Sequence, residues 1–161
     1  MRAPFAIACL LAPAWADAQS APVLDAGAAS AIVQGCAAHA AAKKQSHAIA
    51  VVDAGGRLVS ALRMDGNGYG IMDFAVAKAG AAAAWGFPTA RMGEAVKSTP
   101  GFADAPHVVT VAGGVPVFDA SGRTRIGAVG VSGEAPADDE ACAMAGIAAA
   151  GLRYARANAT N

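Results

Sequence analysis

Aromatic and charged residues are both scarce in this sequence. Aromatic residues make up 6% and charged residues 15% of the 161 residues, and the formal net charge at pH 7 is zero. The lysines and arginines do not gather into a basic stripe, so nucleic acid is not an expected partner. Alanine is abundant instead, which favours helices that pack closely through small side chains.

Sequence motifs for the common catalytic and metal sites are also missing. The chain has no Cys-x-x-Cys, His-x-x-His or phosphate-binding P-loop pattern. Ser132 lies among glycines in "GVSGE", but these glycines do not have the spacing of a Gly-x-Ser-x-Gly nucleophile elbow. These patterns therefore predict no catalytic residue and no metal-ion site, and they leave open whether the protein is an enzyme.

The chain begins with a short apolar stretch, "MRAPFAIACLLAPAWADAQS". An early arginine precedes an apolar run over residues 5–11, and small residues suit cleavage after Ala16 or Ala18. We expect residues 1–18 to be a signal peptide and residues 19–161 to form one periplasmic or secreted domain. The alternative is a buried N-terminal helix. No apolar segment reaches the about 20 residues that span a bilayer, so no membrane span is expected.

Cysteine is nearly absent from the exported part of the chain. Of three cysteines, Cys9 belongs to the signal peptide, which leaves Cys36 and Cys142. Two cysteines in an exported protein can pair, and the alternative is a free thiol that serves as a ligand or redox centre. Their spacing does not decide, because pairing requires the two Cα atoms to lie within about 7 Å of each other.

Helical and strand-like patterns follow one another along the rest of the chain. Tight glycine-containing turns between the strands predict antiparallel pairs. The pattern predicts an α+β fold, in which helices pack on a five-stranded antiparallel sheet. The predicted helices cover residues 24–44 (beginning at Asp25), 71–85, a short stretch capped by Thr89, and 138–157, and the predicted strands are "AIAVVD", "RLVSALRM", "HVVTVA", "VPVFD" and "RIGAVGVSG".

Several stretches in this order resemble one known family. They are "AVVDAGGRLVSALRMDG", "AVAKAGAAAAW", "AGGVPV" and "GAVGVSGEAPADDEACAMAG". Over residues 48–152 the chain is similar to the GlcG/HbpS family of haem-binding or haem-degrading domains, which includes the C-terminal domain of PduO-type proteins. The resemblance implies a profilin-like fold, homo-oligomers from dimers to octamers, and haem as a ligand. Members of this family are also linked to extracellular redox sensing and to corrinoid or glycolate operons.

The resemblance has one further structural implication and one departure. In a profilin-like fold the first and last helices lie side by side, which makes a Cys36–Cys142 disulfide plausible; two separate buried thiols are the alternative. The departure is "NGYGIMD", where the family usually has small residues. There Tyr69 and Met72 place larger groups on a loop that we expect to border the ligand site.

The stretch "GVSGEAPADDE" allows three interpretations. A helix that begins after it could bind an anion at its N-terminus. A metal site would need converging oxygen ligands, but Asp138 and Asp139 are adjacent on a helix and point in different directions. The acidic residues suit the positive end of the helix dipole, so we interpret the stretch as a strand-to-helix junction that forms the wall of a pocket or subunit contact.

Candidate haem ligands follow from the resemblance and from residue type. Haem iron is held by His, Cys, Met or Tyr. His107 follows the rigid Pro106 at the start of a predicted strand, in the neighbourhood that haem-binding relatives use, and is the predicted axial ligand; the alternative is a structural or solvent-exposed histidine. The weaker alternatives are His39, among alanines in the first helix, and His47, which we expect to be exposed.

Arg63 and Lys78 are the predicted partners of haem propionates or another carboxylate. Arg63 ends a predicted strand, and its guanidinium suits bidentate contacts to a carboxylate. Lys78 lies in "AVAKAG", on an otherwise apolar helix face. The alternative for Lys78 is a side chain that covers apolar surface and keeps its ammonium in water.

Three functional hypotheses remain at this point. The first is an exported haem- or tetrapyrrole-binding protein that acts in sensing, scavenging or buffering. The second is a GlcG-type protein or enzyme that binds a small organic acid through Arg63, Lys78 and the backbone of "VSG". The third is an oligomeric interaction module without a ligand, since faces rich in glycine and alanine suit close subunit packing.

Overall fold

A computed structural model describes residues 22–157, and the predicted signal peptide lies outside the described residues. The elements alternate between helices and antiparallel strands along the chain. In order they are α1 (Ala26–Lys43), β1 (Ala48–Asp53), β2 (Leu58–Arg63), α2 (Tyr69–Trp85), α3 (Thr89–Ser98), η1 (Phe102–Asp104), β3 (Gly114–Phe118), β4 (Arg125–Ser132) and α4 (Pro136–Ala149).

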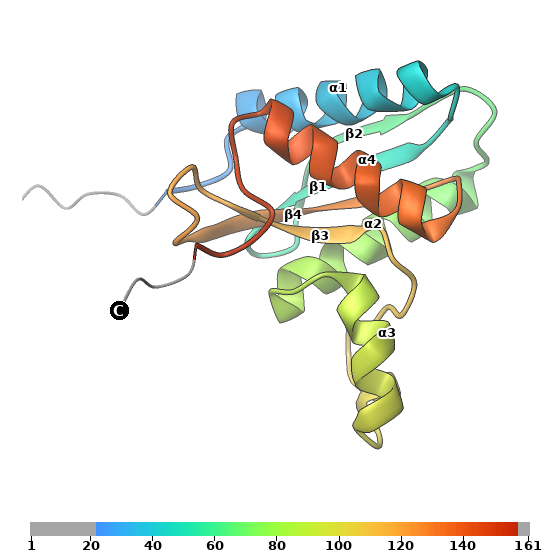
Figure 1. Ribbon diagram of the computed structural model, residues 1–161, viewed down its shortest axis with the longest axis vertical. Coiled ribbons are helices and arrows are strands. Elements are labelled where there is room, and N and C mark those ends of the chain that lie inside the picture. The colour runs from blue at the N-terminus through green and yellow to red at the C-terminus, as the bar shows by residue number, and fades with distance from the viewer. Residues whose placement is uncertain (1–21, 158–161) are drawn as a thin grey trace, which may run out of the picture.

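The strands form a single sheet with helices on both faces. The strand order is β2-β1-β4-β3, and every neighbouring pair is antiparallel. Helices α1 and α4 lie side by side on one face, while α2 covers the other (Figure 1). Helix α3 projects away from the sheet (Figure 1). The fold is therefore α+β with three layers, and the sheet is the middle one.

Two hydrophobic cores stabilise these layers. The larger core lies between the sheet and the pair α1 and α4, and it contains the larger aliphatic side chains, such as Ile32, Ile49 and Ile147. The second core lies between the sheet and α2, and it consists almost entirely of alanine. Gly130 of β4 allows this close approach, because a Cβ there would collide with the backbone carbonyl of Ala75 in α2.

The sheet of the described residues has four strands, so the prediction of five is wrong. Residues 107–112 carry a valine pattern typical of a strand but form no ladder. The outer edge of β3, where such a strand would pair, is already taken. The amide of Gly114 donates to the hydroxyl of Thr89, and the amides of Phe118 and Arg153 donate to each other's carbonyls. Pro116 lies between them and has no N–H to donate.

Three helix boundaries also bear on the predictions. Asp25 is the N-cap of α1, as predicted, and its carboxylate accepts from the amide of Ala28 at 2.7 Å. Thr89 does not cap α3; Pro88 occupies that position. Helix α4 ends at Ala149 rather than at residue 157, because the chain turns at Gly151 with a φ of 72° and then pairs with the end of β3.

Candidate functional site

A buried cluster of charged and polar groups lies at one end of β4. Lys78 of α2 is 1% exposed and Asp139 of α4 is 2% exposed, and Lys78 Nζ lies 2.9 Å from Asp139 Oδ2. Lys78 also donates to the carbonyl oxygen of Val131 at 2.9 Å. Because α2 and α4 cover opposite faces of the sheet, this ion pair joins the two outer layers past the end of the strand.

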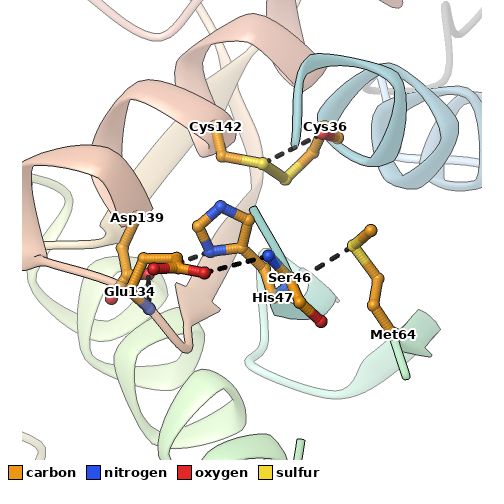
Figure 2. Close-up of a disulfide and its surroundings, with 7 residues drawn as sticks. All are labelled: Cys36, Ser46, His47, Met64, Glu134, Asp139 and Cys142. Carbon is orange, nitrogen blue, oxygen red and sulfur yellow. Dashed lines mark hydrogen bonds and ion pairs between the residues drawn. A yellow bond between two sulfur atoms is a disulfide. The ribbon is translucent and has the colours of Figure 1, made fainter. Parts of the chain in front are cut away.

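His47, the residue directly before β1, completes the cluster. Its side chain is fully buried, so the expectation that it is exposed is wrong. Its Nδ1 lies 3.1 Å from Asp139 Oδ1, which also accepts from the amide of Glu134. In Figure 2 one ring nitrogen of His47 faces Asp139 and the other is directed towards the Cys36–Cys142 disulfide. That second nitrogen, Nε2, is buried without a hydrogen-bond partner among the described residues.

The two cysteines are bonded to each other between α1 and α4. The S–S distance is 2.02 Å and the Cα atoms lie 4.8 Å apart, and the two cysteines are 106 positions apart in sequence. Both cysteines are fully buried. Figure 2 shows the disulfide beside the His47 and Asp139 cluster, so covalent and ionic links meet in the same part of the core.

The position of Asp139 in this cluster explains the acidic start of α4. Asp138 and Asp139 both lie in the first turn of the helix, as the macrodipole favours. Asp139, however, turns inward and is the carboxylate that compensates Lys78. Gly113 makes room for this arrangement, since a Cβ there would lie 2.9 Å from Lys78 Nζ. Lys78 therefore joins the two outer layers through a buried ion pair, and its ammonium is not in water.

His107, the predicted axial ligand, lies on a surface pocket of about 490 Å³ on the α2 side of the sheet. This volume is within the range of small-molecule sites. Four segments contribute: the β1–β2 turn, the outer face of α2, the chain before β3, and the start of β4. The lining residues are Ala54, Gly55, Gly56, Val76, Ala77, Gly80, Ala83, Ala84, His107, Val109 and Arg125.

The loop that carries His107 is held in place by α2. The indole of Trp85 donates to the carbonyl oxygen of Pro106 at 3.0 Å, and its ring stacks edge-on against Phe102 with centroids 4.9 Å apart. His107 itself has a φ of 60°, in the left-handed region that few non-glycine residues adopt. The anchored backbone thus keeps the exposed imidazole at the pocket.

Arg125 is the cation of this pocket, and sequence reasoning missed it. Its guanidinium lies against Gly86 at the end of α2, where a Cβ would collide with it. Among the described residues, no carboxylate lies within ion-pair distance of it. The predicted cations lie elsewhere: Lys78 is buried, and the Arg63 guanidinium bonds to the carbonyl of Asn67 at the end of β2. No motif surrounds Arg125 that could have identified it.

The pocket combines three chemical features. The wall formed by α2 is lined by glycine, alanine and valine. Because these side chains are short, the wall is apolar and has no large protruding groups. An exposed imidazole and an unpaired guanidinium border that wall. Such a set can coordinate a metal centre through His107 and bind a carboxylate through Arg125, while a flat apolar group packs on α2.

Tyr69 and Met72, the residues that depart from the family pattern, do not lie on a loop. They form the first turn of α2, and Tyr69 is 83% exposed. Neither residue is among those that line the His107 pocket.

Across residues 22–157, no helix is both long and apolar enough to cross a membrane. Within the same residues, no group of three or more His, Cys, Asp or Glu side chains is placed to hold a metal ion.

Known structures share this fold. A double mutant of Streptomyces reticuli HbpS is 28% identical and has a TM-score of 0.73, with 89% of this chain and 97% of that chain covered. The PduOC–haem complex is 22% identical, a level that shows the fold alone; its TM-score is 0.75, with 84% of this chain and 100% of that chain covered. No protein with a curated description matches. The family model described as "Haem degrading protein HbpS-like" matches residues 24–148. The chain therefore belongs to the HbpS-like family.

Proposed function

We propose that this protein is an exported haem- or tetrapyrrole-binding protein, and that His107 is the ligand of the haem iron. The observation that carries the proposal is the placement of the His107 imidazole beside Arg125 on one apolar pocket. The family description, which names haem degradation, supports it. The haem-bound PduOC structure supports it as well, since that protein has the same fold.

The residues of the pocket fit a haem group. Haem is a flat apolar macrocycle with two propionates at one edge and an iron that accepts an axial nitrogen. The small residues along α2 leave room for a flat ring to pack against the helix. Arg125 has no carboxylate partner among the described residues, so it is free to bind a propionate. Haem would supply the iron chemistry, and the chain would supply binding and orientation.

A hemin titration followed by the Soret absorption tests this proposal. His107→Gly removes the imidazole without straining the loop, because glycine readily adopts the φ of 60° found there. We expect wild-type protein to give a saturable Soret band, His107→Gly a weaker and shifted band, and Arg125→Gln a higher Kd. Arg123→Gln, an exposed arginine outside the pocket lining, serves as the control and should match wild type.

Each outcome of the titration bears on a separate part of the proposal. A wild-type protein that gives no saturable band would contradict haem binding. A saturable band that is identical in His107→Gly would keep haem but remove His107 as the ligand. A loss of affinity in Arg123→Gln equal to that in Arg125→Gln would mean that general surface charge, and not this pocket, attracts hemin.

Export is the second part of the proposal. It rests on the signal-peptide pattern of residues 1–18 and is supported by the Cys36–Cys142 disulfide, since disulfides persist mainly in oxidising compartments. We expect the purified mature protein to begin after Ala16 or Ala18, in the periplasm or outside the cell. Intact-mass measurement of protein recovered from the native host tests this. A mass that includes residue 1 would contradict export through this signal.

Assembly into homo-oligomers is the third part. Large apolar side chains are exposed on the edge strand β2, with Leu58 at 56% and Leu62 at 38% exposed. Exposed apolar groups that lie together mark interaction surfaces more often than free surface. Light scattering coupled to size-exclusion chromatography should therefore give a mass of two or more chains. A monomeric mass at all concentrations would contradict this part alone.

A further inference from the structure

A second pocket, of about 520 Å³, lies along the outer edge of β3. It is bounded by the start of α3, the edge of the sheet, one side of α4 and the chain after α4. The proposed haem site does not include it, although the two adjoin at Gly86, against which Arg125 lies. The lining residues are Gly86, Phe87, Pro88, Arg91, Val115, Pro116, Phe118, Glu140, Met144, Tyr154, Ala155 and Arg156.

The lining of this pocket is apolar and partly aromatic. Val115 and Phe118 of β3 are 1% and 3% exposed, so they form a fixed base. Phe87 and Met144 are partly buried and border the base from two sides. An aromatic or aliphatic group placed here would lose contact with water against side chains that are already held by the core, which favours binding.

Two arginines stand over this apolar lining. The guanidinium of Arg91 lies 5.7 Å from the ring centroid of Phe87, and that of Arg156 lies 5.7 Å from the ring centroid of Phe118. Within residues 22–157, neither guanidinium has a carboxylate partner within 4.0 Å. Stacking on a ring orients a guanidinium while its N–H groups remain free for a planar anion.

The third charged group of the pocket is Glu140 of α4. Burial raises the pKa of its carboxyl above the usual 4.5. It has no ion-pair partner among the described residues either, so it does not neutralise the arginines by direct contact. The pocket lining therefore carries one more positive than negative charge beside its apolar side chains.

The occupant of this pocket is not an added peptide strand. The outward-facing amides at both ends of β3 are already bonded, those of Gly114 to Thr89 and of Phe118 to Arg153. Pro116, between them on the same edge, has no N–H to offer. A strand that added here would find no backbone donors in β3, so the pocket recognises its ligand through side chains.

We propose that this pocket binds a small carboxylic acid with an aromatic or aliphatic body. The carboxylate bonds to Arg91 and Arg156, and the body packs on Val115, Phe118 and Met144. The charges and the apolar lining select this class together, because a purely polar acid would leave the lining wet and a neutral apolar molecule would leave the arginines unpaired.

A titration of ¹⁵N-labelled protein with phenylacetate, followed by backbone amide shifts, tests this proposal. Phenylacetamide has the same body without the charge and is the matched probe. We expect saturable shifts around Phe118, Met144 and Tyr154 with phenylacetate. The Kd should rise about tenfold or more in the double variant Arg91→Gln/Arg156→Gln, because each hydrogen bond between an arginine and the carboxylate contributes to the free energy of binding. Arg57→Gln, an exposed arginine outside the lining, should leave the Kd unchanged.

Two further variants make the test specific. Glu140→Gln removes a negative charge beside the ligand and should lower the Kd for phenylacetate. Arg91→Lys keeps the charge but loses the planar fork, so its Kd should lie between those of wild type and Arg91→Gln. Both variants report on the charge of the ligand. Loss of structure would weaken binding in each variant, so it would produce neither a lower Kd in Glu140→Gln nor an intermediate Kd in Arg91→Lys.

Three results would overturn the proposal. The first is the absence of saturable shifts at the pocket. The second is equal binding of phenylacetamide, and the third is an unchanged Kd in the double arginine variant. The proposal stands apart from haem binding, because His107→Gly should bind phenylacetate with the wild-type Kd. Loss of phenylacetate binding in His107→Gly would show instead that the two pockets form one site.

Discussion

Lys78 and Asp139 form an ion pair in the interior of the protein, with 2.9 Å between Nζ and Oδ2. The two residues come from helices on opposite faces of the sheet and lie 61 positions apart in sequence. Burying either charge alone would be strongly unfavourable, so each residue makes the position of the other possible. This pair explains both the lysine in the alanine-rich helix and the acidic start of the last helix.

Removal of the Lys78 charge should destabilise the protein strongly. In Lys78→Met, Asp139 is left buried without its cation, and we expect the free energy of unfolding to fall by about 3–5 kcal/mol. Urea denaturation measures this. Lys43→Met is the control, because Lys43 Nζ lies 3.9 Å from Asp138 Oδ1 on the surface. Surface ion pairs contribute at most about 1 kcal/mol to the free energy of unfolding. Equal losses in the two variants would contradict a structural role for Lys78.

Reduction of the Cys36–Cys142 disulfide should also lower stability. The bond links residues 106 positions apart, and restricting so long a loop in the unfolded chain stabilises the native state by about 2–5 kcal/mol. We expect a lower urea midpoint for protein reduced under denaturing conditions and refolded in reductant. A thiol assay should verify the reduction. If the midpoint of fully reduced protein equals that of the oxidised protein, this expectation is wrong.

Gly130 should tolerate no side chain. A Cβ at this position of β4 would collide with the backbone of α2 at Ala75, and backbone cannot rotate out of the way. Overpacking of this kind costs about 1–3 kcal/mol or more, so Gly130→Ala should lower the thermal midpoint clearly. Gly70→Ala, on the open side of the same helix, meets nothing within 4 Å and should be neutral or slightly stabilising.

Glu140→Gln should stabilise the protein at neutral pH. Burial raises the pKa of Glu140 above 4.5, so the folded state binds this proton more tightly than the unfolded state. Ionisation of Glu140 therefore costs stability at pH 7. As the pH falls through the raised pKa, this cost is relieved, and it is gone below the unfolded value near 4.5. The advantage of Glu140→Gln should shrink over the same interval.

Thermal midpoints between pH 7 and pH 4 measure this difference. Glu94→Gln is the matched control, because Glu94 is exposed and pairs only with Lys97 in the next turn of α3. It should show no stabilisation at pH 7. A constant difference between Glu140→Gln and wild type across the range would contradict the link to the titration of Glu140.

The local parts of the fold were readable from the sequence. The first two strands with their glycine turn and the N-cap at Asp25 follow from neighbouring residues, and the structure confirms them. The prediction of a strand at residues 107–112 was wrong, because a valine pattern indicates only that a segment is able to form a strand. Whether it becomes one depends on a free sheet edge, and Thr89 and Arg153 occupy that edge from distant parts of the chain.

The candidate site was readable only in part, for the same reason. His107 stood out by its residue type and by the family resemblance, and the structure places it at a pocket. Its cationic neighbour could not be identified, since Arg125 reaches the pocket through the fold and no motif marks it. The buried ion pair of Lys78 could not be predicted, because its partner, Asp139, is 61 positions away in sequence and meets it only when the helix layers pack on the sheet.

Imidazole rescue of His107→Gly tests the central claim, that His107 holds the haem iron, most directly. The variant leaves a space where the ring stood and keeps a backbone conformation that glycine favours. We predict that hemin bound to His107→Gly has an altered Soret band and that added imidazole restores the wild-type spectrum, while wild type does not respond. A wild-type spectrum in His107→Gly before any imidazole is added would contradict the claim.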